Sequence, residues 1–243
     1  YITFNPKLSF SFFTANGGRF LINLDFKKTS YTSISFIPQT QYGNSSTFLY
    51  GLGYEYNSYD NITFPSRGML IKSNLNTGSR RLLQKQSPSS NLIEGDFFAE
   101  AFIPIYEKRF LIGIRSISKV KAIYNTKGSS TLFENEMYRI GGMGTIRGFN
   151  QEAVLSTAFS IASLELHLRM SEGSGIYLFA DKAFLKTYEL GYNKDRWPLG
   201  LGIGLNMFTK AGLFNLSYAL GQGFGQSLGT RDAKVHFGIS TVF

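Results

Sequence analysis

The stretch DAKVHFGISTVF, residues 232–243, alternates between two kinds of side chain. Large or β-branched residues occupy every second position, and polar or small residues occupy the positions between them. The first set is Val235, Phe237, Ile239, Thr241 and Phe243, and the second is Lys234, His236, Gly238 and Ser240. A period of two puts successive side chains on opposite faces of a β-strand. The stretch therefore predicts a strand with one apolar face and one polar face.

The same alternation recurs along the chain, in RFLINLDF (19–26), SLELHLRM (163–170), GLGIGLNMF (200–208) and GLFNLSYAL (212–220). Counting such segments predicts an all-β protein of twelve antiparallel strands. The predicted strands are 7–14, 19–27, 31–37, 48–57, 67–77, 92–105, 109–120, 158–169, 175–186, 197–208, 212–221 and 232–243.

Two architectures produce this pattern, a soluble β-sandwich and a transmembrane β-barrel. In both, apolar and polar side chains alternate along each strand. Here the apolar face is large and aromatic over many strands, and the polar face carries charges and small residues, as the lumen of a barrel does. The pattern favours the transmembrane barrel.

Composition excludes several other classes of function. The 243 residues include no cysteine and only two histidines, so we expect no disulfide, no metal site and no cofactor. The formal charge of +9 arises from scattered basic residues, so we expect no nucleic-acid partner. No run approaches the roughly 18 apolar residues of a membrane helix, whereas a barrel strand needs only about 9–11.

The connections between predicted strands also differ in length. Those after the second, sixth, eighth and tenth strands are short, and most others are longer and polar. Short turns on one side and long loops on the other are typical of bacterial outer-membrane barrels with both termini in the periplasm. We therefore expect a single domain, residues 1–243, in contact with outer-membrane lipid and lipopolysaccharide.

The connection before the eighth predicted strand contains IGGMGTIRGF, residues 140–149. Its glycines are not followed by a helical pattern or by a Lys-Ser/Thr pair, so a phosphate-binding loop is excluded. The segment GGMGTIRGF resembles the Arg-Gly-Phe/Tyr loop of the Omp85 superfamily. The motif residues are Gly141, Gly142, Gly144, Ile146, Arg147, Gly148 and Phe149.

Other stretches are similar to the same superfamily, in the same order. TFPSRGMLIKSNLNTG (63–78) is similar to its periplasmic turn and the strand after it. SLELHLRM and IYLFAD (176–181) are similar to two wall strands, and the glycine-rich hairpin 201–221 and C-terminal Phe243 to its last strands. Together these matches run from Thr63 to Phe243. The superfamily includes BamA-type and TamA-type proteins, which insert or translocate proteins at the outer membrane.

The resemblance implies that the loop folds into the barrel, where Arg147 would meet carboxylates of the wall. In SLELHLRM the leucines face lipid, so Glu165 points into the lumen, and the same parity turns Asp181 inward. A poorly hydrated arginine seeks bidentate carboxylate pairing. The resemblance implies that Asp181 is the first partner, because the arginine of the family pairs with the corresponding strand, and Glu165 is the second.

The chain also departs from the superfamily. Seven predicted strands precede the arginine loop where members have eleven, and no N-terminal POTRA module is visible in the sequence. Either the chain is a fragment, or it belongs to a reduced branch with a twelve-stranded barrel. An even strand number favours the reduced branch, because it lets an antiparallel sheet close without unsatisfied edges.

Two classes of function remain open. The first is insertion or translocation of client outer-membrane proteins at a seam between the first and last strands, which would be loosened at Gly238 and end at Phe243. The second is a structural or pore-forming barrel, which could form a homodimer. For Gly238, relief of crowding in the lumen is an equal alternative to loosening. No serine lies in a nucleophile context beside His167, so we expect no enzyme.

Overall fold

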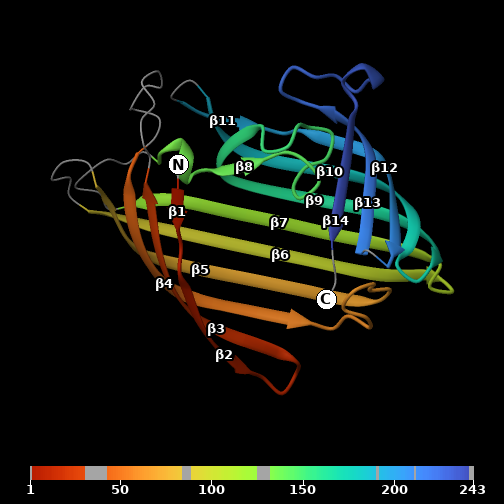
Figure 1. The fold of residues 1–243 in the computed structure, drawn as a ribbon, viewed down its shortest axis with the longest axis horizontal. Coiled ribbons are helices and arrows are strands. Elements are labelled where there is room, and N and C mark those ends of the chain that lie inside the picture. The colour runs from red at the N-terminus through yellow and green to blue at the C-terminus, as the bar shows by residue number, and fades with distance from the viewer. Residues whose placement is uncertain are drawn as a thin grey trace. The chain divides into compact units, whose positions relative to one another are not determined.

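The computed structural model describes residues 2–30, 43–83, 89–124, 132–189, 192–210 and 212–240. They form one antiparallel sheet of 14 strands, with two single-turn 3-10 helices (Figure 1). The prediction of an antiparallel all-β fold is confirmed. Within the described part of the chain, no helix has the length and apolar character needed to cross a membrane.

The strands follow the sequence in nearly regular order across the sheet, β1-β3-β4-β5-β6-β7-β9-β10-β12-β13-β14, with β2 beside β3, β8 beside β9 and β11 beside β10. Their bounds are β1 Ile2–Phe4, β2 Lys7–Phe13, β3 Gly18–Ser30, β4 Ser45–Asn57, β5 Gly68–Leu82, β6 Ser90–Tyr106, β7 Phe110–Tyr124, β8 Tyr138–Ile140, β9 Val154–Ser171, β10 Ser174–Glu189, β11 Tyr192–Arg196, β12 Leu199–Thr209, β13 Gly212–Gln222 and β14 Lys234–Ser240; the 3-10 helices are η1 Glu134–Glu136 and η2 Thr230–Asp232.

Three strands of the sheet, β1, β8 and β11, lie outside the predicted ranges, and proline explains two of them. β1 and β2 both pair with β3 and are separated at Pro6, and β11 and β12 both pair with β10 and are separated at Pro198. Each proline carbonyl accepts a bond from the neighbouring strand, at 3.1 Å from the Phe26 amide and 3.0 Å from the Ala183 amide. Proline has no N–H to return, so each interrupts a continuous ladder.

Eleven of the twelve predicted ranges coincide with strands of the sheet. The remaining range, 31–37, lies outside the described residues. In the sheet β3 pairs directly with β4, from Gly18 opposite Tyr56 to Thr29 opposite Ser45. Residues 187–196 were expected as a loop, but 187–189 at the end of β10 pair with 192–194 of β11. Side-chain periodicity could not show this pairing, because the segment YELGYNKDR (188–196) lacks a regular apolar face.

The contacts divide the chain into two compact units. Unit 1 comprises residues 1–56, 72–97 and 119–138, and unit 2 comprises residues 57–71, 98–118 and 139–243. The boundaries fall within β5, β6 and β7, before the last residue of β4 and after the first residue of β8, so these strands contribute to both units. The expectation of a single domain, and that of closure between the first and last strands, stay predictions.

In unit 1 the start of β1 is at the end of β3 away from the first turn. Ile2 pairs with Ser30, whereas the tight turn from Thr14 to Gly18 joins β2 to the beginning of β3. In unit 2 the end of β14 is beside the β12–β13 turn, because Ser240 pairs with Leu213. Tyr1 and Phe243 themselves lie outside the described residues.

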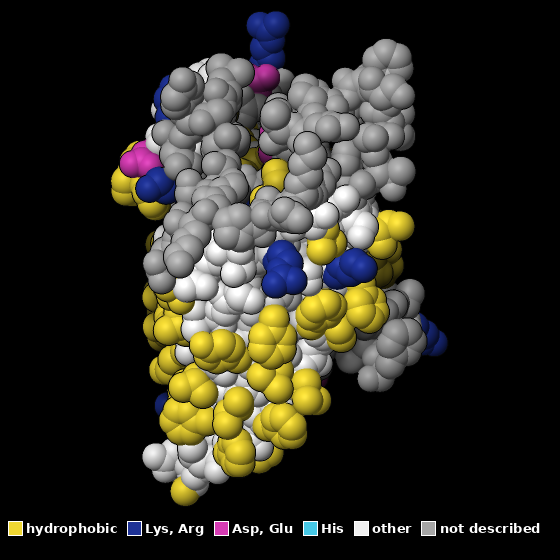
Figure 2. Space-filling view, turned by 90° about the vertical axis from the view of Figure 1, so that its left-hand side faces the viewer, with side chains coloured by type: hydrophobic (Ala, Val, Ile, Leu, Met, Phe, Trp, Pro, Cys, Tyr) yellow, Lys and Arg dark blue, Asp and Glu magenta, His cyan; other side chains and the backbone are white. Residues whose placement is uncertain are grey.

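One face of the sheet in unit 2 exposes apolar side chains, and we call it the apolar face. The alternation in the sequence predicts that nine residues of this unit contact lipid. Seven of them are exposed, and the other two, Leu168 and Phe214, are half-buried. Unit 1 has the same alternation on β3, where Phe20, Ile22 and Leu24 are exposed and Asn23 is buried. Figure 2 shows a broad gathering of hydrophobic side chains on one face of the molecule, with few charged groups among them. The seven exposed residues are Leu164, Leu166, Ile203, Leu205, Leu216, Phe237 and Ile239.

We predict that Leu205→Arg will destabilise the protein in a bilayer by about 2–4 kcal/mol, because a charge on a lipid-facing strand near mid-membrane loses its hydration. Leu205 lies on β12 between Ile176 and Leu216 of its neighbours and is 37% exposed. Unfolding in vesicles would measure the loss. The matched control is Leu228→Arg, an exposed position outside the strands. Equal stability of the two variants would contradict the assignment of the apolar face.

Candidate functional site: the arginine loop

Residues 141–153 connect β8 to β9 and form the arginine loop of unit 2. In Figure 1 this green segment coils beside the C-terminal strands, and its backbone touches β12 and β13. A tight hairpin begins it, in which the Gly142 amide bonds the Ile146 carbonyl at 3.1 Å. Ile146 and Phe149 are 1% and 4% exposed, so they anchor the loop as core residues do.

Glycine is required at three points of the loop, Gly141, Gly142 and Gly148, because all three have a positive φ. Gly148 has φ +92°, and a Cβ there would lie 2.7 Å from the carbonyl oxygen of Leu220 on β13. Gly141 has φ +124°, and its Cβ would lie 2.1 Å from the Asn150 carbonyl oxygen. L side chains rarely adopt such angles. The predicted motif residue Gly144 differs, because no atom lies within 4 Å of its Cβ position.

Arg147 lies in the middle of the loop and is 3% exposed. Its Nε donates to Asp181 Oδ2 at 2.8 Å and its Nη2 to Asp181 Oδ1 at 2.6 Å, which is a bidentate pair. Its Nη1 donates to Glu165 Oε1 at 2.7 Å. The backbone amide of Arg147 also donates to Asp181 Oδ2, at 3.1 Å. The structure thus brings together the arginine and the two carboxylates that the sequence named.

Aromatic rings surround the same arginine. Its guanidinium carbon lies 3.6 Å from the ring centre of Phe179, two residues before Asp181 on β10. His167 stacks on Tyr177 with ring centres 5.2 Å apart, and its Nε2 lies 2.8 Å from Glu165 Oε2. These rings were not among the predicted site residues. The strand alternation that places Asp181 on this face nevertheless places Phe179 and Tyr177 there too.

The charges of the site determine its protonation. Burial alone would lower the pKa of Arg147, but hydrogen bonds and attraction from Asp181 and Glu165 outweigh it and raise this pKa. Arg147 therefore stays protonated at any pH compatible with folding.

The loop also touches the last strand of the sheet. The Gly148 amide donates to His236 Nε2 on β14 at 3.3 Å. A Cβ on Gly238 would lie 3.1 Å from the sulfur of Met143 in the loop, so Gly238 leaves room for that side chain. This contact accords with the crowding alternative for Gly238. Phe243, the other predicted residue of this region, lies outside the described residues.

Comparison with known proteins identifies the family. The Omp85 superfamily domain matches residues 2–243, nearly the whole chain. The chain belongs to the Omp85 superfamily. No curated protein sequence matches this Omp85 chain.

Among solved structures, this Omp85 chain is similar to the crystal structure of BamA from Haemophilus ducreyi lacking POTRA domains 1–3. The TM-score is 0.65 at 18% sequence identity, and the match covers 97% of this chain and 53% of that one. At this identity the likeness concerns the fold. The Omp85 chain spans about half the length of that protein.

Unit 1 of this Omp85 chain contains a second buried ion pair, between Arg80 of β5 and Glu136 of η1. Arg80 Nε donates to Glu136 Oε1 at 2.8 Å, Nη2 contacts Oε2, and both side chains are almost fully buried. Glu136 also accepts from the Ser45 hydroxyl at 2.8 Å and from the Phe133 amide at 3.0 Å. Four groups therefore hold one carboxylate and fix η1 against β4 and β5.

Lys121 of β7 extends this network, because its Nζ donates to the Glu136 carbonyl at 2.9 Å and pairs with Glu94 of β6 at 2.9 Å. No feature of the sequence pattern had indicated this group. Glu136 lies in LFENEMY (132–138), which has no periodicity, and its neighbour Glu134 has the same side chain in the same stretch. Only the three-dimensional arrangement separates the two glutamates.

We predict that the protein loses stability as the pH is lowered, because Glu136 becomes protonated. Burial raises its pKa, but the bonds from Arg80 outweigh burial and lower this pKa below its ordinary value of 4.5. A lowered folded-state pKa gives stability that is complete above the ordinary value and is lost as pH falls through the folded value. Glu136→Gln should reduce this acid-induced loss, measured as the melting temperature between pH 7 and pH 3. Glu134→Gln, which removes no ion pair among the described residues, should leave the loss unchanged. The same pH profile for both variants would contradict the assignment.

Proposed function

We propose that this Omp85 chain promotes insertion or translocation of other proteins at the bacterial outer membrane, as a β-barrel with a lateral seam between its first and last strands. The apolar face would contact lipid, and the opposite face, with Arg147, Asp181 and Glu165, would line the lumen. Clients would be unfolded outer-membrane proteins, whose strands pair with a free sheet edge.

The contact of the arginine loop with β14 carries this proposal. β14 ends the strand order, and in the described part of the sheet its only neighbour is β13. Its residues Val235, Phe237 and Ile239 are 67%, 61% and 53% exposed. An edge strand supported on its other face by a clamped loop could open without unfolding the rest of the sheet, because the loop and β9–β13 hold one another.

The orientation follows from the connections. We place the short turns, such as residues 107–109 and 172–173, in the periplasm, as in other outer-membrane barrels. The end of β14 is then periplasmic, because Ser240 lies beside the β12–β13 turn. Ile2 pairs with Ser30, at the other end of β3 from its short turn. The proposal therefore retains the expected periplasmic position for the C-terminal end only.

Reconstitution tests the proposal. The full chain in lipid vesicles should accelerate the folding of a urea-denatured outer-membrane barrel, followed by its shift on semi-native gels. Vesicles that hold an equal amount of an unrelated barrel are the control. An acceleration no larger than in the control would contradict insertase activity. Ion conductance without such acceleration would favour a pore-forming barrel.

A further inference from the structure

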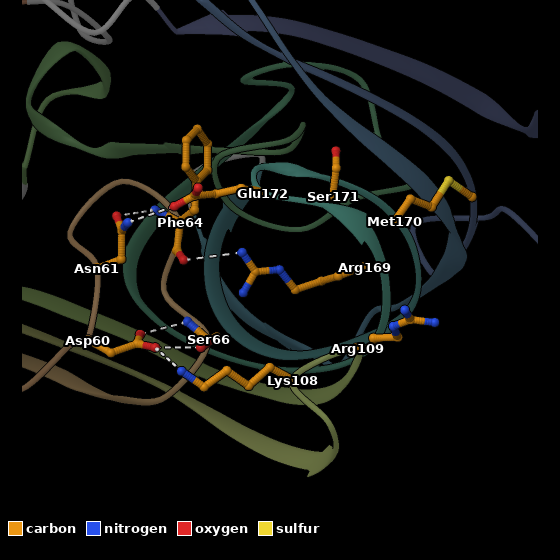
Figure 3. Close-up of a pocket in the computed structure, with 10 residues that line it drawn as sticks. All are labelled: Asp60, Asn61, Phe64, Ser66, Lys108, Arg109, Arg169, Met170, Ser171 and Glu172. Atoms are coloured by element: carbon orange, nitrogen blue, oxygen red, sulfur yellow. Dashed lines mark hydrogen bonds and ion pairs between the residues drawn. The ribbon is translucent and has the colours of Figure 1, made fainter.

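A polar pocket of about 470 Å³ lies at the short-turn end of unit 2 (Figure 3). It is formed where the 58–67 turn meets the β6–β7 turn and the end of β9. The ends of β7 and β9 are neighbours here, since the Arg169 amide donates to the Arg109 carbonyl at 2.8 Å. Its size lies within the range of about 300–1,000 Å³ that is usual for small-molecule sites.

The walls of the pocket are fixed by bonds within the protein. Asp60 accepts from the Ser66 amide at 2.8 Å and from the Arg67 amide at 3.1 Å, and Asn61 donates to Glu172 at 3.2 Å. Phe64 packs edge-on against Phe208 of β12 with ring centres 4.7 Å apart. The 58–67 turn is therefore tied to the β9–β10 turn and to β12 of the same unit before any ligand binds.

The cationic side chains of the pocket make fewer and longer contacts with the protein than its acidic side chains do. Asp60 and Glu172 both accept hydrogen bonds from the protein. Lys108 Nζ lies 3.8 Å from Asp60 Oδ2, and among the described residues the Arg169 side chain donates only to the Phe64 carbonyl, at 3.5 Å. Arg109 has no side-chain partner among the described residues. Three cations against two acids leave one net positive charge, together with two guanidiniums able to bind an oxyanion.

The rim of the pocket on one side is apolar. Met170 lines the pocket and is 68% exposed, on the same face of β9 as Leu166. Tyr106 and Phe110, on either side of the β6–β7 turn, are 60% and 46% exposed. Exposed aromatic residues near strand ends mark the level of lipid headgroups in outer-membrane barrels. Figure 3 shows Arg169 extending across the pocket toward Phe64, with Arg109 and Met170 on the other side.

We propose that this pocket binds the phosphodiester headgroup of a membrane phospholipid, with Arg109 and Arg169 on the phosphate and the acyl chains beside Met170. A free phosphate would satisfy the guanidiniums but would leave the apolar rim unused. The proposal rests on the membrane location in the proposed function, and it is independent of insertase activity.

Native mass spectrometry of the full chain, released from neutral detergent, tests the site with phosphatidylglycerol as the probe. Diacylglycerol of the same chain length lacks the phosphate and should not bind. Arg109→Gln/Arg169→Gln should weaken phosphatidylglycerol binding about tenfold or more, the loss expected for one charge-assisted hydrogen bond. The matched control is Arg231→Gln, which removes the same charge from η2, and it should bind as the unmodified chain does.

Arg109→Gln alone controls for misfolding of the double variant. The Arg109 side chain has no partner among the described residues, so this variant should fold normally and still bind less lipid. Inorganic phosphate that displaces the lipid at equal concentration would contradict the lipid as the ligand. Binding that is equal in the double variant and in Arg231→Gln, or absent in a folded chain, would overturn the site. A chain that binds lipid here but inserts no client refutes the proposed function only.

Discussion

Asp181→Ala should lower the free energy of unfolding by about 3–5 kcal/mol, because it leaves the buried guanidinium of Arg147 without its bidentate partner. Arg147→Ala should lower the free energy of unfolding by a similar amount, since it leaves the buried carboxylate of Asp181 without its cation and removes the contact with Phe179. Denaturant unfolding in micelles would measure both losses. The single tryptophan of the chain, Trp197, precedes β12 in the same unit and would report the transition by fluorescence.

Coupling between the two residues is the sharper prediction. The double variant Arg147→Ala/Asp181→Ala should be no less stable than either single variant, because each single change already breaks the pair. Asp195→Ala is the matched control, an exposed aspartate on the neighbouring β11, and it should change stability little. Strictly additive losses from Arg147 and Asp181 would contradict the ion pair as the element that holds the loop.

Arg80→Met should also destabilise the protein by about 3–5 kcal/mol, because Glu136 would remain buried without its cation. Thermal unfolding followed by circular dichroism would measure the loss. Arg81→Met is the matched control, since Arg81 is the exposed neighbour on the same strand. Equal losses for Arg80→Met and Arg81→Met would contradict the role of the buried pair.

Replacing both members of this pair should restore much of the stability. In Arg80→Met/Glu136→Leu no buried charge is left, and apolar replacements of buried ion pairs are often neutral. The hydroxyl of Ser45 and the amide of Phe133 would lose an acceptor, so we expect recovery to be incomplete. A double variant as unstable as the sum of the two single variants would show that the charges act independently.

The sequence predicts the strands and one ion pair well, and for the same reason. Parity along a strand is a local property, so the pattern of SLELHLRM placed Glu165 opposite the leucines, and IYLFAD placed Asp181 on the same face. The partner, Arg147, came from the resemblance of IRGF to a family motif. Where a residue lies in a strand with an unbroken pattern, its face can be read without the structure.

Other features depend on contacts that periodicity does not encode. Pro6 and Pro198 separate β1 and β11 from the strands that follow them, and the sequence predicted neither of these short strands. Proline affects hydrogen bonding, which side-chain alternation does not report. Glu136 acquires its partner from β5, more than fifty positions earlier in the sequence. The contact of Met143 with Gly238 likewise joins a loop to a distant strand, and neither segment of sequence predicts it.

Cysteine crosslinking tests most directly whether the arginine loop lies against the last strand. The chain has no cysteine of its own, so the pair Met143→Cys/Gly238→Cys can be introduced alone and joined by a short thiol-reactive crosslinker. The control pair is Met143→Cys/Ile239→Cys, because Ile239 is exposed on the opposite face of β14. We predict rapid crosslinking at position 238 and little at position 239. Equal rates for the two pairs, or faster crosslinking at 239, would contradict the docking of the loop on β14.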